Sequence, residues 1–482
     1  MEQIKTPLYD ALENFYKKNK ISFHVPGHKN GQIFFTQGPS FFQSVLSIDA
    51  TELTGLDDLH APEGPILQSQ FMLANLYRVK KSFFLINGST VGNLAMIQAV
   101  CEPGDTVFVQ RNCHKSILHG LMLANANPVF LTPNYYEDWG IAGSLDAITV
   151  LKALESYPKP KAIILTYPNY YGLAEEENVK KIIHIAHEKN IPVLVDEAHG
   201  AHLTLAYPFP KSSISFGADI VVHSAHKTLP AMTMGSFLHF NSNLIEETQI
   251  EFYLQMLQSS SPSYPIMASL DLSRGYLASF TEEDQSYLLK KINAFKNLLS
   301  TIKEIEILAP PAKVTMDPLK VTIRSTIGLS GYELQKLLEE KGIYTELADP
   351  QNVLFVLPLL KREEEYPFKQ TVEFIQSAVK NQVKSKVNAP SFHWKEIEMM
   401  TNLEIPYSEM RKRSKKQTPF KEAIGKIAGE MIIPYPPGIP LIMLGERITI
   451  EKINTLEKLI SLGSRFHGGT GLENEKLVIF EK

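Results

Sequence analysis

Seven short runs rich in β-branched and aromatic residues alternate with helical stretches in the first half of this chain, and this alternation restricts the possible folds more than any other feature. Helical periodicity fills most of the gaps, as in residues 91–100, 115–126 and 178–190. Strands that alternate with helices typically form a doubly wound, mainly parallel sheet. The sequence therefore predicts an α/β fold. The expected strands are residues 82–87, 106–110, 127–132, 161–167, 191–196, 219–224 and 235–240.

The remaining sequence predicts further domains, because 482 residues exceed the usual size of one hydrophobic core. Two helical segments and two apolar strands after residue 285 indicate a small α/β domain. A third unit begins near residue 385; it carries a basic run at 411–417, which we expect to be a solvated surface, and a proline-rich turn at 434–440. The expected parts are an N-terminal arm (1–35), a large domain (36–285), the small domain (286–384) and a C-terminal domain (385–482).

Charge and cysteine content narrow the class of ligand and the compartment. A formal net charge of −4 gives no electrostatic reason to expect nucleic acid or an anionic membrane as the main partner. Cys101 and Cys113 lie in different local contexts, so we expect no disulfide framework and a reducing cytoplasm. The N-terminus lacks the apolar segment of a signal peptide, and no stretch approaches the roughly 20 apolar residues of a membrane span. We expect a small-molecule ligand.

Polar residues follow three of the expected strands. Residues 87–90 (NGST) come after the first, residues 196–199 (DEAH) after the fifth and residues 224–227 (SAHK) after the sixth. Ligands of such sheets bind at the carboxyl ends of the strands. We therefore expect these residues to converge on one edge of the sheet.

Each polar cluster has a structural and a functional interpretation. The turn at 87–90 is either an ordinary strand-to-helix connection capped by Ser89 or Thr90, or an anion site, since amides and hydroxyls at a helix N-terminus suit a phosphate. It is not a GxGxxG dinucleotide fingerprint. Asp196 either caps a loop or acts as a carboxylate that holds a pyridinium proton or a metal.

Lys227 connects these clusters. A lysine at the end of an apolar strand either extends its ammonium group into water or forms a Schiff base with an aldehyde. Pyridoxal phosphate requires an anion site, a carboxylate for its ring nitrogen and such a lysine. The separation between Asp196 and Lys227 leaves room for a helix and a strand, which would place both at the ends of neighbouring strands. The combination predicts a pyridoxal-phosphate site.

A metallohydrolase is the competing interpretation, because four histidines and Asp196 are numerous enough for a transition-metal site. The histidines do not form an HExxH motif, however, and the cation of Lys227 would repel a divalent ion. We therefore expect no metal. The four histidines are His199, His202, His223 and His226.

The ordered motifs of the chain resemble those of the Orn/Lys/Arg decarboxylases, in the short form that lacks an N-terminal wing domain. The resemblance covers nearly the whole chain. It implies a pyridoxal-phosphate-dependent transferase-like fold (aspartate aminotransferase fold type I), with a seven-stranded, mainly parallel sheet, a small α/β domain and a C-terminal domain. The motifs are HVPGHKNG (24–31), DATELTGLDDLHAPEG (49–64), NGSTVGN (87–93), RNCHKS (111–116), TYPNYYG (166–172), VDEAHGAH (195–202), SAHKT (224–228), SSSPSYP (259–265) and PYPPGIP (434–440).

The resemblance also implies the roles of individual residues. Lys227 should bind the cofactor aldehyde, Asp196 should pair with the pyridine nitrogen, and His114 should stack on the ring. Either Lys227 or His114 should protonate Cα of the substrate after carbon dioxide leaves. The other implied cofactor contacts are Ser89, Thr90, Ala198, His199, Ser224, His226 and, reaching the neighbouring subunit of a homo-oligomer that is at least a dimer, Ser260.

The implied reaction is decarboxylation of a basic amino acid, with arginine first and then lysine or ornithine, in polyamine synthesis. A buried distal cation requires a carboxylate. We expect it among Glu52, Asp57 and Asp58, which are otherwise acids of a surface loop. An aminotransferase or a β-eliminating lyase of the same fold type remains an alternative, as does a cofactor-binding protein without catalysis.

Overall fold

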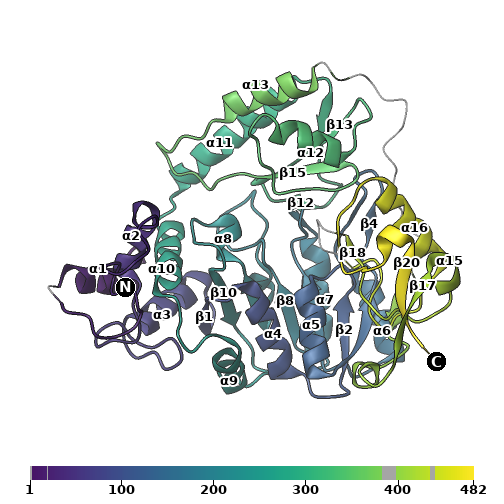
Figure 1. Ribbon diagram of the computed structural model, residues 1–482, viewed down its shortest axis with the longest axis horizontal. Coiled ribbons are helices and arrows are strands. Elements are labelled where there is room, and N and C mark those ends of the chain that lie inside the picture. The colour runs from purple at the N-terminus through teal and green to yellow at the C-terminus, as the bar shows by residue number, and fades with distance from the viewer. Residues whose placement is uncertain (1–2, 19, 381, 383–397, 435–439, 482) are drawn as a thin grey trace. The chain divides into compact units, whose positions relative to one another are not determined.

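The computed structural model describes residues 3–18, 20–380, 382, 398–434 and 440–481 (Figure 1). The chain forms two compact units. Unit 1 comprises Met1–Val100, Leu194–Leu205 and Ser212–Thr281, and unit 2 comprises Cys101–Val193, Ala206–Lys211 and Glu282–Lys482. The four-part domain division remains a prediction, because its boundary near 385, like most of the turn at 434–440, lies outside the described residues.

Unit 1 contains four of the seven predicted strands, in the order β1 (Lys81–Leu85), β10 (Ser236–Phe240), β9 (Ile220–His223) and β8 (Val193–Asp196). β8 and β9 are parallel, whereas β10 runs antiparallel to both β9 and β1. Every residue of β8, β9 and β10 is buried, as expected for strands covered on both faces. Because β8 and β9 are parallel, their carboxyl ends lie side by side.

Helix α4 (Gly88–Val100) follows β1 and packs against β1, β9 and β10. Gly92 permits the close approach, because a Cβ atom there would lie 2.7 Å from Leu85 Cδ1 and 2.9 Å from Val222 Cγ1. Helix α4 is therefore held with its first turn near the carboxyl end of the strands. The other helices of unit 1 are α1 (Pro7–Lys17), α2 (Pro39–Ile48), α3 (Pro65–Tyr77), η1 (Ser213–Phe216), α8 (Ala225–Thr228), α9 (Glu247–Leu257) and α10 (Tyr264–Ala278).

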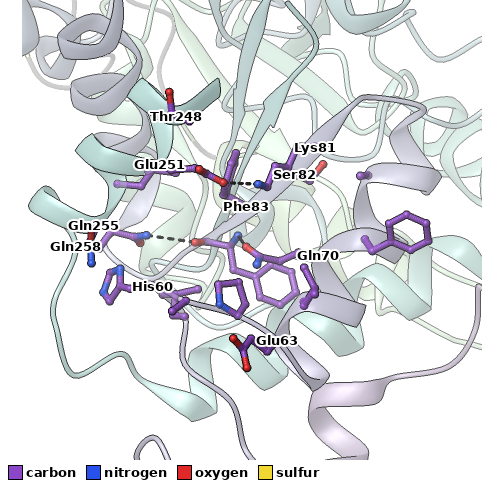
Figure 2. A pocket seen from close by; sticks show the side chains of 18 of the residues that line it. His60, Glu63, Gln70, Lys81, Ser82, Phe83, Thr248, Glu251, Gln255 and Gln258 are labelled. Carbon is purple, nitrogen blue, oxygen red and sulfur yellow. Dashed lines mark hydrogen bonds and ion pairs between the residues drawn. The ribbon is translucent and has the colours of Figure 1, made fainter. Parts of the chain in front are cut away.

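One edge of β1 pairs with β10, and side-chain amides hydrogen-bond to backbone N–H groups on the other edge. Gln70 Oε1 accepts a hydrogen bond from the Phe84 N–H at 2.9 Å, and Gln258 Oε1 accepts one from the Ile86 N–H at 2.9 Å. Such groups prevent an exposed edge from pairing with another chain. Figure 2 shows Gln70 and Gln258 in the wall of a pocket of about 700 Å³ beside this strand. No predicted site residue lines this pocket.

Unit 2 contains the other predicted strands, in the order β6 (Ala162–Thr166), β2 (Thr106–Gln110) and β3 (Asn127–Leu131), all parallel. A short strand that the sequence did not predict, β16 (Met400–Asn402), pairs antiparallel with β3. The helices that follow these strands are α5 (Lys115–Ala124), α6 (Ala147–Ser156) and α7 (Glu176–His187), and the short strands are β4 (Tyr135–Tyr136), β5 (Ile141–Ala142) and β7 (Leu173–Ala174).

The small α/β segment of unit 2 has an antiparallel sheet in the order β11 (Ile305–Ile307), β13 (Lys320–Ser325), β15 (Asn352–Val356) and β14 (Leu347–Ala348). Two of its helices were predicted, although the first begins earlier than the sequence pattern indicated. The remaining short strand, β12 (Thr315–Met316), pairs with β7. The helices are α11 (Glu282–Leu299), α12 (Gly331–Glu339) and α13 (Phe368–Val379).

The C-terminal segment packs around its own apolar cluster, which includes Leu456 and Ile479. The basic run at 411–417 is exposed throughout, which agrees with a solvated surface. No helix among the described residues is long and apolar enough to cross a membrane. The elements are α14 (Tyr407–Met410), β17 (Lys415–Pro419), α15 (Phe420–Ala423), β18 (Ile433–Pro434), α16 (Ile450–Ser461), β19 (Phe466–His467), η2 (Leu472–Asn474) and β20 (Lys476–Phe480).

Candidate active site

Lys227 lies in the single turn of α8, directly after β9. Its Nζ atom is 3.2 Å from His199 Nε2, so two predicted site residues contact each other. The turn is held in place by His226, whose backbone N–H and Nδ1 both hydrogen-bond to the Gly235 carbonyl, at 3.2 and 3.0 Å. The amine of Lys227 is thus presented from a fixed turn at the end of a core strand.

Asp196 ends the neighbouring strand β8 and is buried. Asn93 Nδ2 donates to its Oδ2 at 2.9 Å, and the Ala198 N–H donates to its Oδ1 at 3.2 Å. Two hydrogen bonds orient the carboxylate, and each oxygen retains acceptor capacity. Sequence reasoning did not assign a role to Asn93. Its spacing from Ser89 could have indicated such a role, because Ser89 and Asn93 are four residues apart and share a face of α4.

The first turn of α4 provides groups that suit an anion. Gly88 has a φ of +77°, and a Cβ atom there would meet nothing within 4 Å. The Ser224 hydroxyl donates to Ser89 Oγ at 2.8 Å, and the Ser224 N–H donates to the Ala198 carbonyl at 3.2 Å. The first amides of a helix have no intrahelical partner and lie at the positive end of its dipole. Thr90, also in this turn, is exposed.

These groups fit pyridoxal phosphate. Two hydroxyls and the start of a 13-residue helix suit the phosphate, a buried carboxylate suits the ring nitrogen, and a primary amine suits the aldehyde. The histidines of the competing metal interpretation have other contacts, since His223 bonds to Glu197 and His199 to Lys227. In the described ranges, no group of three or more His, Cys, Asp or Glu side chains lies close enough to hold a metal ion.

His114 and Ser260 have roles that remain predictions. His114 lies in unit 2, where it caps α5 and its Nδ1 accepts from the Ser116 N–H at 3.3 Å. Ser260 is exposed in the loop between α9 and α10. The adjacent Ser259 N–H donates to Asn87 Oδ1 at 3.4 Å, so this loop lies beside the turn that precedes α4.

The three acids predicted to bind a distal cation all act electrostatically on Tyr264. Burial, followed by the charges of Glu52, Asp58 and Asp57, raises the pKa of the Tyr264 hydroxyl. Glu52 is exposed, and Asp58 is partly buried. Asp57 instead supports the backbone: its two carboxylate oxygens accept five N–H groups, those of residues 58, 63, 64, 66 and 67, including the start of α3.

The sequence of the chain is similar to those of known proteins in one enzyme family. The family described as Orn/Lys/Arg decarboxylase matches residues 6–315 with its major domain and residues 387–471 with its C-terminal domain. The chain is 47% identical to the uncharacterised protein YaaO of Bacillus subtilis, over 99% of both chains. It is 33% identical to an arginine decarboxylase of the same organism, over 97% of this chain and 96% of that protein.

A solved structure confirms the fold. The lysine decarboxylase LdcF of Francisella novicida superposes with a TM-score of 0.82, over 99% of this chain and 81% of that chain, at 20% sequence identity. Identity at this level establishes a shared fold and nothing about substrate. The predicted α/β fold is therefore confirmed.

Proposed function

The chain belongs to the Orn/Lys/Arg decarboxylase family, and from this premise we propose that it decarboxylates arginine, with lysine and ornithine as the next candidates. Membership makes it a pyridoxal-phosphate-dependent amino acid decarboxylase that acts on a basic substrate. The observation that carries the proposal is the convergence of Lys227, Asp196 and Ser89 at the carboxyl ends of β9, β8 and β1. The arginine decarboxylase of Bacillus subtilis, similar over nearly the full length of both chains, supports arginine as the first candidate.

Bound pyridoxal phosphate supplies a ring that accepts the electron pair released when carbon dioxide leaves the substrate. Asp196, oriented by Asn93, holds a proton at the ring nitrogen. Ser89 and Ser224 bind the phosphate together with the first amides of α4. Lys227 Nζ, which lies 3.2 Å from His199 Nε2, would deliver a proton to Cα of the substrate, with His114 as the alternative donor.

The acidic loop supplies the proposed binding site for the distal cation of the substrate. The acceptor positions of Asp57 serve backbone amides, so we assign this role to Glu52 and Asp58 and give Asp57 a supporting one. Glu52→Gln and Asp58→Asn should each raise KM and leave the absorbance of the bound cofactor unchanged. An unchanged KM in both variants would remove this assignment.

We also propose a homodimer, in which Ser260 contributes to the neighbouring site. Several large apolar side chains of the N-terminal segment are almost fully exposed, including Ile21 (86%), Phe23 (93%) and Phe41 (88%). Exposed apolar groups of this kind mark interaction surfaces, and a second copy is the partner we propose for them. Sedimentation of the cofactor-loaded protein as a monomer would contradict this. A cytoplasmic role in polyamine synthesis fits a chain whose two cysteines, Cys101 and Cys113, are buried and form no disulfide.

The decisive experiment measures carbon dioxide release from arginine, lysine and ornithine by the cofactor-loaded protein, with Lys227→Ala as control. We expect release from arginine that disappears in the variant. Release from lysine or ornithine alone would correct the substrate. Keto acid or ammonia in place of carbon dioxide would establish an aminotransferase or a lyase instead.

A further inference from the structure

We propose that Glu197 and His223 are positioning residues for the cofactor site, and that they act through a buried hydrogen-bond chain that ends at Ser82. The inference rests on pyridoxal phosphate binding to Lys227 and Asp196, as described above. None of the steps assigned to the reaction uses this chain of side chains. It nevertheless contains the residue after Asp196 and the residue before Ser224.

The chain crosses four neighbouring segments of unit 1. Ser82 Oγ on β1 lies 2.8 Å from His239 Nδ1 on β10, and His239 Nε2 lies 3.1 Å from His223 Nδ1 on β9. His223 Nε2 lies 3.0 Å from Glu197 Oε1, just beyond β8. The four side chains are at most 1% exposed. Ser82, labelled in Figure 2, is the end of the chain that reaches the pocket beside β1.

The Glu197 end of the chain is anchored, and an aromatic ring packs against its centre. The Ser213 N–H donates to Glu197 Oε2 at 2.8 Å, and the Ser213 hydroxyl donates to the same oxygen. The ring of Tyr77 covers both imidazoles, with centroid distances of 4.2 Å to His239 and 5.2 Å to His223. Buried networks that are fully hydrogen-bonded specify one arrangement of the elements that they join.

One assignment of the ring protons lets the hydrogen bonds of the chain run in a single direction. Burial, and then the neighbouring His223, lowers the pKa of His239 well below its usual value, so this imidazole is neutral and has one donor and one acceptor. In this assignment the Ser82 hydroxyl donates to His239 Nδ1, His239 Nε2–H donates to His223 Nδ1, and His223 Nε2–H donates to Glu197 Oε1. The carboxylate of Glu197 is then the final acceptor, at the end of the chain next to Asp196.

This arrangement explains how the chain positions the cofactor residues. Glu197 lies between Asp196 and Ala198 in the sequence, and His223 immediately precedes Ser224. A hydrogen bond between Glu197 and His223 thus fixes the ends of β8 and β9 relative to each other. The same hydrogen bond therefore sets the distance between the Asp196 carboxylate and the turn that carries Lys227.

The test compares Glu197→Gln with Asp219→Asn by absorbance titration with pyridoxal phosphate. Asp219 is another buried carboxylate (2% exposed) just before the other end of β9, where its Oδ1 accepts from the Ser242 hydroxyl at 2.5 Å. Glu197→Gln should weaken cofactor binding about tenfold and shift the pH midpoint of the bound-cofactor absorbance, because it removes a buried charged acceptor. Asp219→Asn should lower thermal stability and leave both readouts unchanged.

A milder variant keeps the test decisive if Glu197→Gln does not fold. Ser82→Ala removes the terminal donor and should weaken cofactor binding about threefold, because it withdraws one neutral hydrogen bond from the chain. Wild-type cofactor affinity and pH profile in Ser82→Ala, or in a folded Glu197→Gln, would show that the chain only stabilises the fold and would overturn the inference. If the wild-type protein itself fails to bind pyridoxal phosphate, the proposed function fails, and this inference fails with it.

Discussion

Replacing Glu446 with glutamine should lower the free energy of unfolding substantially, because this carboxylate completes a buried ion-pair cluster in unit 2. Arg111 donates from Nη1 and Nη2 to its two oxygens, at 2.7 and 2.9 Å, and Lys452 Nζ lies 2.9 Å from Oε1. The side chains of Arg111 and Glu446 are 1% and 4% exposed. The variant would leave the guanidinium of Arg111 buried without its counter-charge.

The pKa of Glu446 gives the size of the effect. Burial alone would raise this pKa, but the charges of Arg111 and Lys452 outweigh burial and lower it from 4.5 to about 2. That difference corresponds to about 3 kcal/mol of stability, near the cost of breaking a buried pair. Burial lowers the pKa of Lys452, which means that the charged form of this lysine is disfavoured at its position. We therefore assign the stabilisation to the bidentate pair of Glu446 with Arg111.

The sign of the pH dependence follows from the direction of the shift. Because the folded pKa of Glu446 lies below its unfolded value, the stabilisation is complete above about pH 4.5 and is lost as the pH falls toward 2. Urea unfolding of the wild-type protein and Glu446→Gln should therefore differ most at neutral pH. The difference should decrease in acid.

An exposed pair provides the control. Glu404 Oε1 lies 3.0 Å from Arg447 Nε, and these side chains are 41% and 52% exposed. Glu404→Gln should change the free energy of unfolding by less than about 1 kcal/mol, because solvent screens the pair. Equal effects of Glu404→Gln and Glu446→Gln, or a Glu446→Gln effect that does not vary with pH, would refute the reasoning.

Four further predictions concern unit 1. Asn93→Ala should weaken pyridoxal-phosphate binding about tenfold in an absorbance titration, because Asp196 loses an orienting donor; unchanged affinity would contradict this. Gly92→Ala should destabilise by about 1–3 kcal/mol in urea, because the added methyl displaces packed side chains. Asp57→Ala should lower the melting temperature, with a loss of about 2 kcal/mol, because the start of α3 loses its acceptor. Because the pKa of His239 lies below 6.5 in the folded protein, the unfolded chain binds a proton first as the pH falls, and the free energy of unfolding should decrease below pH 6.5. His239→Gln should remove this part of the pH dependence of unfolding.

The strands were predictable because most of their residues are buried, so that each strand is a short apolar run. All seven runs that the sequence indicated are strands, with ends that differ by at most two residues, as in β8, where the predicted 191–196 is Val193–Asp196. Strand β16 was not predictable, because its three residues are only partly buried or exposed and carry no apolar pattern. Helix α11 begins at Glu282, earlier than expected, because its first turns are largely polar.

The candidate site was predictable where a residue directly follows a strand. Lys227 and Asp196 are found by this rule because parallel strands bring their carboxyl ends together. Asn93 lies inside α4, and the position of Glu197 after β8 does not indicate its role, since the roles of both come from partners 103 and 26 residues away in sequence. Side-chain hydrogen bonds of this range depend on strand order and register, which short sequence patterns do not encode.

The same distinction explains the acids of the loop at 52–58. From sequence, Glu52, Asp57 and Asp58 were equivalent candidates for a substrate cation, because each is a carboxylate in one polar turn. The structure separates them by the acceptors that remain available: Asp57 Oδ2 alone accepts three backbone N–H groups. If the Asp57 carboxylate turned toward a ligand, the backbone N–H groups that it accepts would lose their hydrogen bonds. Substrate specificity should therefore depend on Glu52 and Asp58, whereas Asp57 should determine whether the loop that carries them is formed.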